Sequence, residues 1–300
     1  MPLTQLNFQP GIDTENTATG AEGKWIDCDK VRFRKGLPQK IGGWTKFSPE
    51  YYVGVGRALE QWYSLTGSRY EALGTDRKVY AYVAGQSQDI TPIRETATLV
   101  NAITTTNTSA TLTISDSAHG ADVGDFVTLS SVSANVGGIL STVLDAEYEI
   151  LTITNVDAYT ILSSATATST VGPTANCTAN YQLNIGPSEQ TFGYGWGSGT
   201  WSTSTWGTAR ATSNVTLDAR LWSINNWGED LVITQKDGGT YEWDTSGGMS
   251  DNRATVIANA PTTSTLSMIS TETRHVVCMG TETTIGSVGT QDKMFIRWSD

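Results

Sequence analysis

One stretch of the chain, residues 220–244, restricts the possible folds most strongly. Residues 231–233 form a short apolar run, and Tyr241 and Trp243 alternate with polar neighbours. Between them lies Asp237-Gly-Gly, a group of residues that tolerates positive φ and favours a tight hairpin turn. The pattern predicts two antiparallel strands with one buried face. Because such a pair is not stable alone, we expect it to pack against another sheet.

The same layout occurs earlier in the sequence. The matching pairs are each 161 residues apart (228 − 67): Gly67 with Gly228, Asp76 with Asp237, Tyr80 with Tyr241, and Tyr82 with Trp243. A looser third copy covers residues 275–280 and 294–299. Repeated hairpins with an aromatic residue in the outer strand are typical of β-propeller blades, in which neighbours bury each other's faces. The alternative is that unrelated hairpins of an all-β protein share these features.

Composition supports an all-β fold. The chain has 300 residues, of which 38% are hydrophobic and 16% charged, with 30 glycines and 10 tryptophans. Aromatic and β-branched residues are plentiful and no helical period is sustained, which favours strands and argues against disorder. We therefore predict an all-β protein with β-propeller-like blades and an inserted small β-sandwich or barrel domain.

Changes in composition divide the chain into four segments. Residues 95–209 contain no lysine or arginine, and Thr, Ser, Ala and Val dominate to about residue 185. Propeller blades repeat at about 40–50 residues, so an inserted domain explains the longer spacing between the matching hairpins. The predicted segments are an extended N-terminal arm (1–23), a first propeller part (24–94), an inserted small β domain (95–187), and a second propeller part with a Trp/Gly-rich loop (188–300).

The N-terminal region contains the most basic part of the sequence. Residues 24–44 read as a hairpin that contains a cluster of cations: Lys30, Arg32, Arg34, Lys35 and Lys40. We expect a solvated strand face or an ionic contact with an acidic neighbouring subunit, and an anion site is the alternative. The polar arm needs another surface to order it. The candidates for subunit contacts in this region are Phe8, Ile12, Trp25, Arg32, Arg34 and Trp44.

The Trp/Gly-rich loop carries three further candidates. Trp196, Trp201 and Trp206 lie five residues apart among glycines, in a segment that cannot build its own core. Their rings are expected to be buried at a packing or subunit interface. A sugar-stacking platform is the alternative.

The net charge of −11 limits the ways in which the chain can meet nucleic acid. It disfavours binding of duplex DNA through a basic face, yet an acidic wall lets DNA pass without adhering. The candidates for a channel or outer wall are Asp122, Asp125, Asp145, Glu147 and Glu149. Glu147 and Glu149 share one face of a predicted strand, so cation binding or glycoside hydrolysis with a partner is an alternative role.

Residue types that mark catalytic sites are sparse. His119 and His275 are interpreted as structural, and no nucleophile elbow or phosphate-binding loop surrounds them. Cys28, Cys177 and Cys278 lie far apart, which favours free thiols over disulfides or a zinc site. We expect no catalytic residues, no cofactor and no metal. No apolar run approaches membrane-spanning length and no signal sequence is evident, so we expect synthesis in a cytoplasm and no membrane contact.

Several stretches resemble virion proteins of tailed bacteriophages. Residues 8–14 (Phe-Gln-Pro-Gly-Ile-Asp-Thr) and 24–44 are similar to the N-terminal region of nozzle and DNA-stabilisation proteins of short-tailed phages. Residues 221–232 and 237–244 resemble a segment of the same proteins. His119-Gly120, followed by Val-Gly-Asp-Phe-Val at 123–127, is similar to a small β domain often inserted in phage structural proteins.

The resemblance implies a structural component of the virion tail and no enzyme. It implies an oligomeric β-propeller ring, expected to contain six copies, below the portal and adaptor proteins. The channel of the ring would retain and eject the genome, with double-stranded DNA passing without specific binding. Tail fibre or spike proteins are further expected partners, and assembly would take place in the host bacterial cytoplasm. The sequence shows three blade copies, whereas a closed propeller needs at least four. Alternative functions are a glycan-binding tail adhesin that uses the Trp/Gly-rich loop, and a glycoside hydrolase.

Overall fold

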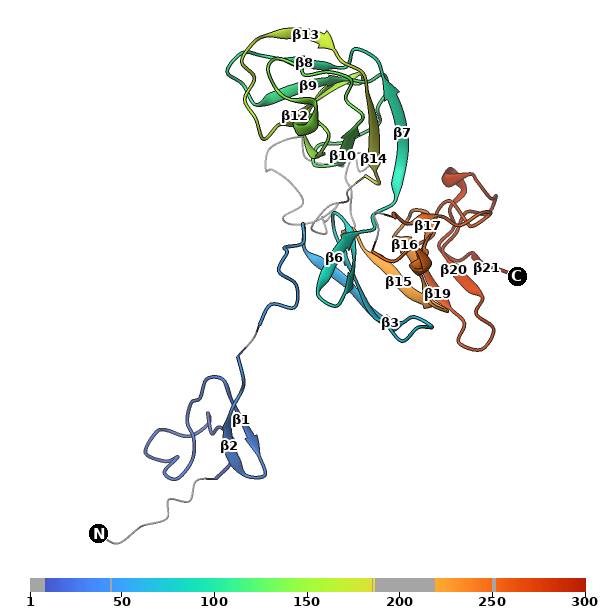
Figure 1. The fold of residues 1–300 in the computed structure, drawn as a ribbon. Helices are drawn as coiled ribbons and strands as arrows, with labels where there is room; N and C mark the ends of the chain where they lie inside the picture. Colours follow the sequence, from blue (N-terminus) through green and yellow to red (C-terminus); the bar gives the residue numbers. More distant parts are fainter. Residues whose placement is uncertain (1–8, 44, 185, 187–218, 250–251) are drawn as a thin grey trace, which may run out of the picture. The chain divides into compact units, whose positions relative to one another are not determined.

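A computed structural model describes residues 9–300 except 44, 185, 187–218 and 250–251 (Figure 1). The described residues form antiparallel β-sheets, with one short α-helix, α1 (Ser141–Leu144), and two 3-10 turns. The all-β prediction is confirmed. The chain divides into two compact units, Met1–Pro49 (unit 1) and Glu50–Asp300 (unit 2), and each is described separately below.

The described residues of unit 1 form one hairpin and almost no core. Strands β1 (Val31–Arg34) and β2 (Leu37–Lys40) pair antiparallel, within the residues for which the sequence predicts a hairpin. A parallel bridge joins Ile12 to Trp25. Among the described residues of unit 1, Ala21 is the one buried hydrophobic side chain. Because a two-stranded hairpin is marginally stable in water, this unit has little of its own to hold it together.

Unit 2 contains three small antiparallel sheets whose strands follow one another in chain order (Figure 1). Sheet 1 comprises β3 (Gly56–Tyr63), β4 (Arg69–Thr75), β5 (Val79–Val83) and β6 (Gln86–Asp89). Sheet 2 comprises β15 (Trp222–Trp227), β16 (Asp230–Gln235), β17 (Thr240–Trp243) and β18 (Thr255–Val256). Sheet 3 comprises β19 (Leu266–Ile269), β20 (Val276–Met279) and β21 (Ile296–Trp298).

The sequence repeat falls at equivalent positions of sheets 1 and 2. Gly67 and Gly228 lie in the turn after the first strand, with φ of 83° and 76°, a region that favours glycine. The matching aspartates lie in the turn after the second strand, and the matching aromatic residues lie in the third strand. The repeat therefore marks two sheets of the same design. A closed propeller stays a prediction.

Aromatic side chains fill the space between sheets 1 and 2. The rings of Trp62 and Tyr70 stack with their centroids 5.3 Å apart. The fully buried Trp243 meets both rings edge-on, at 6.3 Å and 5.9 Å. Buried aromatic rings contribute large apolar areas, and edge-on and offset pairs are favourable geometries. This cluster is the centre of the core that joins the two sheets.

A hydrogen bond from a tryptophan indole to a backbone carbonyl links each sheet to the next. Trp62, near the end of β3, donates its indole N–H to the carbonyl of Glu229 in the β15–β16 turn, at 2.8 Å. Trp227, at the end of β15, donates to the carbonyl of Arg274 in the β19–β20 turn, also at 2.8 Å. The first strands β3, β15 and β19 accordingly lie next to one another. Sheets 1 and 2, and sheets 2 and 3, are thus joined in the same way, by contact between their first strands and by one indole hydrogen bond.

The part of unit 2 between sheets 1 and 2 in the chain forms a separate, eight-stranded antiparallel sheet. In sheet order its strands are β13 (Val171–Thr174), β8 (Ile103–Thr105), β9 (Thr111–Ser115), β12 (Ala158–Leu162), β11 (Glu147–Asn155), β10 (Phe126–Ser130), β14 (Cys177–Gln182) and β7 (Ile93–Leu99). The order has two open ends, so the sheet is not a closed barrel. It surrounds a hydrophobic core of its own.

Strand β11 connects the two halves of this sheet. Its first residues pair with β10 and the remainder pairs with β12, with register irregularities in between. We call residues 93–182 the inserted domain; they lie close to the predicted 95–187. Strands β1 and β2 belong to unit 1, whereas the sequence assigns residues 24–94 to a first propeller part. The domain division proposed from the sequence otherwise stays a prediction.

Replacing Trp243 with alanine is expected to lower the free energy of unfolding by about 3–5 kcal/mol, because it removes a fully buried ring from the core between sheets 1 and 2. Equilibrium urea unfolding measures the change. The matched control is Trp298→Ala, at a side chain that is 69% exposed, for which we expect a change within about 0.5 kcal/mol. Equal losses in the two variants would contradict the assignment of this core.

Candidate functional site

A buried lysine joins sheet 1 to the inserted domain. Lys78, immediately before β5, is 2% exposed. Its Nζ lies 2.7 Å from Oδ2 of Asp89 at the end of β6, and 2.5 Å from Oε2 of Glu147 at the start of β11. The same ammonium lies 4.3 Å from the centroid of the Phe126 ring in β10. Three groups from two parts of unit 2, two carboxylates and one aromatic ring, therefore meet at one positive charge.

Two arginines extend this cluster. Arg253, just before β18, lies 2.9 Å from Asp89 and 3.5 Å from Glu147. Arg77 pairs with Glu149 at 2.9 Å. We call the six charged residues the ionic junction: Arg77, Lys78, Asp89, Glu147, Glu149 and Arg253. Through Arg253 the junction also reaches the segment that leads into sheet 2, so it connects three parts of unit 2.

The electrostatics of Asp89 favour its charged form. Burial alone would raise the pKa of this carboxyl, but Lys78 and Arg253 outweigh burial and hold the pKa below its ordinary value. Thr91 supports the carboxylate with its backbone N–H at 2.9 Å and its hydroxyl at 2.6 Å. Removing one partner from a buried ion pair is costly, because the other charge is then left without compensation.

The five carboxylates predicted for an acidic wall do not share one environment. Glu147 and Glu149 are paired with cations in the ionic junction. Asp125 is 1% exposed and accepts the backbone N–H of Asp122 at 2.8 Å, so its carboxylate does not face solvent. Asp122 and Asp145 are exposed. Glu147 and Glu149 are exposed as well, and the wall role of these residues stays a prediction.

The ionic junction also bears on the alternative of a glycoside hydrolase. Glu147 and Glu149 lie on one face of β11, as the spacing predicts. Their oxygens bind Lys78, Arg253 and Arg77, in contacts that join parts of the chain. Sequence reasoning missed the cations of the junction. The available signal was Arg77-Lys78 immediately before an apolar strand, where a lysine must find a partner to be buried.

The predicted subunit-contact residues are only partly covered by the structure. Phe8, Trp44, Trp196, Trp201 and Trp206 lie outside the described residues. In unit 1, Ile12, Arg32 and Arg34 are exposed, while Trp25 is half-buried with its ring 6.2 Å from that of Phe33. The structure thus brings Trp25 and the hairpin together. The contact role of all these residues stays a prediction.

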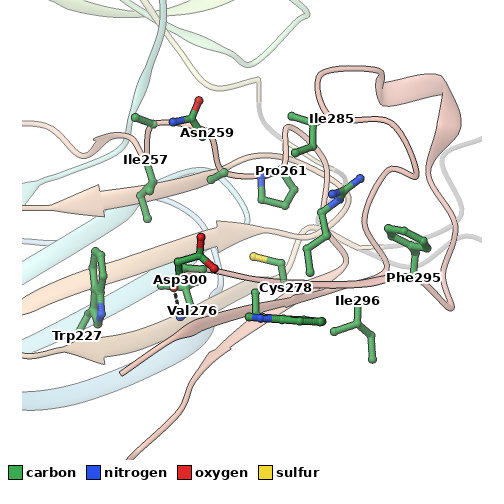
Figure 2. Close-up of a pocket in the computed structure, with 15 residues that line it drawn as sticks. Trp227, Ile257, Asn259, Pro261, Val276, Cys278, Ile285, Phe295, Ile296 and Asp300 are labelled. Atoms are coloured by element: carbon green, nitrogen blue, oxygen red, sulfur yellow. Dashed lines mark hydrogen bonds between the residues drawn. The ribbon is translucent and has the colours of Figure 1, made fainter. Parts of the chain in front are cut away.

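An apolar cleft lies between sheets 2 and 3 (Figure 2). Its volume is about 570 Å³. Figure 2 shows Ile257 and Pro261 on one side and Val276 and Cys278 on the other. Trp227 lines the same cleft. Sheets 2 and 3 share a small core, so their interface is less completely filled than that of sheets 1 and 2.

Two polar residues of this cleft are limited in the chemistry they offer. Burial raises the pKa of the Cys278 thiol, which keeps the thiol protonated and a poor nucleophile. Arg297 donates to the carbonyls of Glu282 and Thr283, at 3.2 Å and 2.9 Å. The other polar residues of the lining are Asn259, Ser299 and Asp300, and the remaining lining residues are apolar.

In the part of the chain that the structure describes, no group of three or more His, Cys, Asp or Glu side chains is placed to hold a metal ion. None of the helices found there has the length and hydropathy that crossing a membrane requires.

Comparison with known proteins gives little. No family model matches the chain, and no curated protein matches it. Among solved structures, the endosialidase of phage phi92 aligns at 16% identity with a TM-score of 0.26. The alignment covers 87% of this chain and 40% of the endosialidase chain, so the chain spans less than half the length of that protein. Similarity at this TM-score carries no conclusion about fold or function.

Replacing Lys78 with methionine is expected to lower the free energy of unfolding by about 3–5 kcal/mol, because Asp89 and Glu147 lose their shared buried cation. The matched control is Lys30→Met. The ion pair of Lys30 with Asp29 is exposed, with side chains 76% and 84% accessible, so we expect a change of about 0.5 kcal/mol or less. Urea unfolding of both variants gives the comparison. A loss below about 1 kcal/mol for Lys78→Met would show that the junction is not a buried pair.

The depressed pKa of Asp89 predicts a loss of stability in acid. A carboxyl whose pKa is lowered by folding adds stability above its unfolded pKa, about 3.9, and this stability disappears as the pH falls through the lower, folded value. The difference in unfolding free energy between the natural chain and Asp89→Asn should therefore be largest above about pH 5 and shrink toward pH 2. Denaturant unfolding over this range provides the measurement. A difference independent of pH would contradict the role of the ionised carboxylate.

Proposed function

We propose that this protein is a structural component of a bacteriophage tail, a nozzle or connector subunit that assembles with copies of itself. The ring so formed would be part of the channel that retains and ejects the genome. The proposal rests first on the resemblance of residues 8–14, 24–44, 221–232 and 237–244 to virion tail proteins. In this proposal the chain carries out no reaction. Its partners are its own copies, portal or adaptor proteins and tail fibre or spike proteins.

One observation from the structure supports this function above others, the lack of a core in unit 1. Its described residues bury one apolar side chain, Ala21, and expose Ile12, Leu37 and Phe47. A segment of this size without a core, disulfide or metal gains stability only from another surface. Such a segment is suited to an assembly subunit, where a neighbour supplies the missing contacts.

The charge of the chain fits a passive conduit for DNA. The net charge is −11, and the cations of the ionic junction are already neutralised by carboxylates. Asp122 and Asp145 remain exposed, as a surface that DNA phosphates do not adhere to requires. Double-stranded DNA would pass such a surface without specific binding.

Sedimentation velocity and negative-stain electron microscopy of the purified chain test the proposal. We expect a discrete ring, and we expect Leu37→Glu to weaken its assembly because a charge replaces an exposed apolar side chain of unit 1. The control is Val100→Glu, at a residue just after β7 of the inserted domain with similar exposure, 69%, which should leave assembly unchanged. Monomers at all micromolar concentrations would contradict the proposal.

A further inference from the structure

We propose that the hairpin of unit 1 binds the inserted domain of a second copy of this chain through opposite charge. The binding surface is the face of the hairpin that carries Arg32 and Arg34, which we call the basic face. The inference rests on the proposed function in one respect, that the chain assembles with its own copies. It goes further by naming the two surfaces that meet.

Charge is distributed unequally between the two units. Residues 1–49 contain seven lysines and arginines and five aspartates and glutamates, a net charge of +2. The whole chain carries −11, so residues 50–300 carry −13. Within unit 1, residues 30–40 contain five cations and no carboxylate, whereas residues 95–209 contain no cation at all. Opposite charges on two surfaces steer them together and suppress wrong pairings.

The register of the hairpin defines the basic face. Arg32 lies opposite Gln39 and Arg34 lies opposite Leu37, so these four side chains project from one face. The Nε of Arg32 donates to the side chain of Gln39 at 3.0 Å, which orients the guanidinium on that face. All four residues are exposed. The opposite face holds Phe33, whose ring lies 6.2 Å from the Trp25 ring, so the packing of unit 1 leaves the basic face open.

The chemistry of this face suits a protein partner better than a nucleic acid. Arg34 stands beside Leu37, which is 70% exposed, and a guanidinium next to an apolar side chain is typical of protein interfaces. A phosphate backbone would leave Leu37 in water. Unit 1 also contains five carboxylates, and the chain as a whole would repel nucleic acid through its charge of −11.

The inserted domain offers a matching acidic surface around the turn of residues 117–122. Arg94 donates to the carbonyl of His119 at 2.9 Å and lies 3.4 Å from Glu95, which places Glu95 beside the turn. The side chain of Asp157 accepts the N–H of Ala118 at 2.9 Å. The acidic rim consists of three exposed carboxylates, Glu95, Asp122 and Asp157. Arg94 is the one lysine or arginine among the described residues of the inserted domain.

Arginine is well suited to such a contact because its planar guanidinium forms paired hydrogen bonds with carboxylates. Two arginines on a flat face can meet carboxylates on the rim at the same time. A contact of this kind is exposed at its edges and is screened by salt, with a Debye length of about 10 Å at 0.1 M. Self-association through it should therefore weaken as the salt concentration rises.

The first experiment reverses the charge of the basic face. We expect Arg32→Glu combined with Arg34→Glu to weaken self-association at least tenfold in sedimentation velocity, and we expect the natural chain to lose association with rising salt. The control is Arg57→Glu combined with Arg69→Glu, which makes the same change of charge on exposed residues of sheet 1. Equal effects of the two double variants would overturn the inference. All four arginines are exposed, and circular dichroism checks that each variant is folded.

The second experiment exchanges the charges between the two surfaces. A variant with Glu95→Lys and Asp122→Lys is expected to associate weakly with itself and to associate with the hairpin variant when the two are mixed. Restored association in the mixture alone supports the contact, and no restoration overturns it. A salt-dependent change of shape in a chain that stays monomeric would also overturn it, since the hairpin would then bind within its own copy.

The outcomes separate this inference from the proposed function. If the natural chain forms rings that neither salt nor charge reversal affects, the inference fails and the proposed function stands. If the natural chain is monomeric throughout, both fail. Binding of a duplex DNA oligonucleotide that is lost only in the hairpin variant would assign the basic face to nucleic acid and overturn the inference.

Discussion

The buried ammonium of Lys78 is the interaction on which the arrangement of unit 2 depends. A lysine is rarely buried, because its charge must be compensated where water is excluded. Here Asp89 comes from sheet 1 and Glu147 from the inserted domain, so neither part can move without exposing or abandoning a charge. The inserted domain has a hydrophobic core of its own, and the ionic junction gives it a specific attachment to sheet 1. The ionic junction thus fixes how the inserted domain is oriented on sheet 1, while the apolar core of the inserted domain stabilises that domain from within.

The two units obtain stability in different ways. Sheets 1 and 2 bury aromatic rings between them, and the indole bond from Trp62 to the next sheet repeats at Trp227. Each sheet therefore stabilises its neighbour, as in repeat proteins. Unit 1 has no such neighbour within itself and keeps its basic face open. Unit 2 is held together by its own packing, whereas unit 1 is suited to contact with another protein surface. This contrast is the physical reason for interpreting the protein as an assembly subunit.

Much of the fold could be predicted from the sequence because the relevant signals are local. Asp237-Gly-Gly gives the turn between β16 and β17, and the match of Gly67 with Gly228 identifies two sheets of one design. The partners of Glu147 could not be predicted, because Lys78 is 69 residues away in the chain and the pairing depends on how separate bodies dock. The burial of Asp125 was also missed. Sequence showed which residues were charged, whereas the structure showed which of those charges were already paired.

The central claim is that opposite charges join one copy to the next. Cross-linking tests it, with assembled protein that contains equal amounts of ordinary and nitrogen-15-labelled chains. A reagent that couples amines directly to carboxylates would be followed by mass spectrometry. We predict links between Lys35 or Lys40 of the hairpin and Glu95 or Asp122 of the inserted domain, in peptide pairs that combine one labelled and one unlabelled chain. The account would be contradicted if these links occurred only in peptide pairs with equal labels, which come from contacts within one chain. It would also be contradicted if the hairpin were linked only to other parts of the protein.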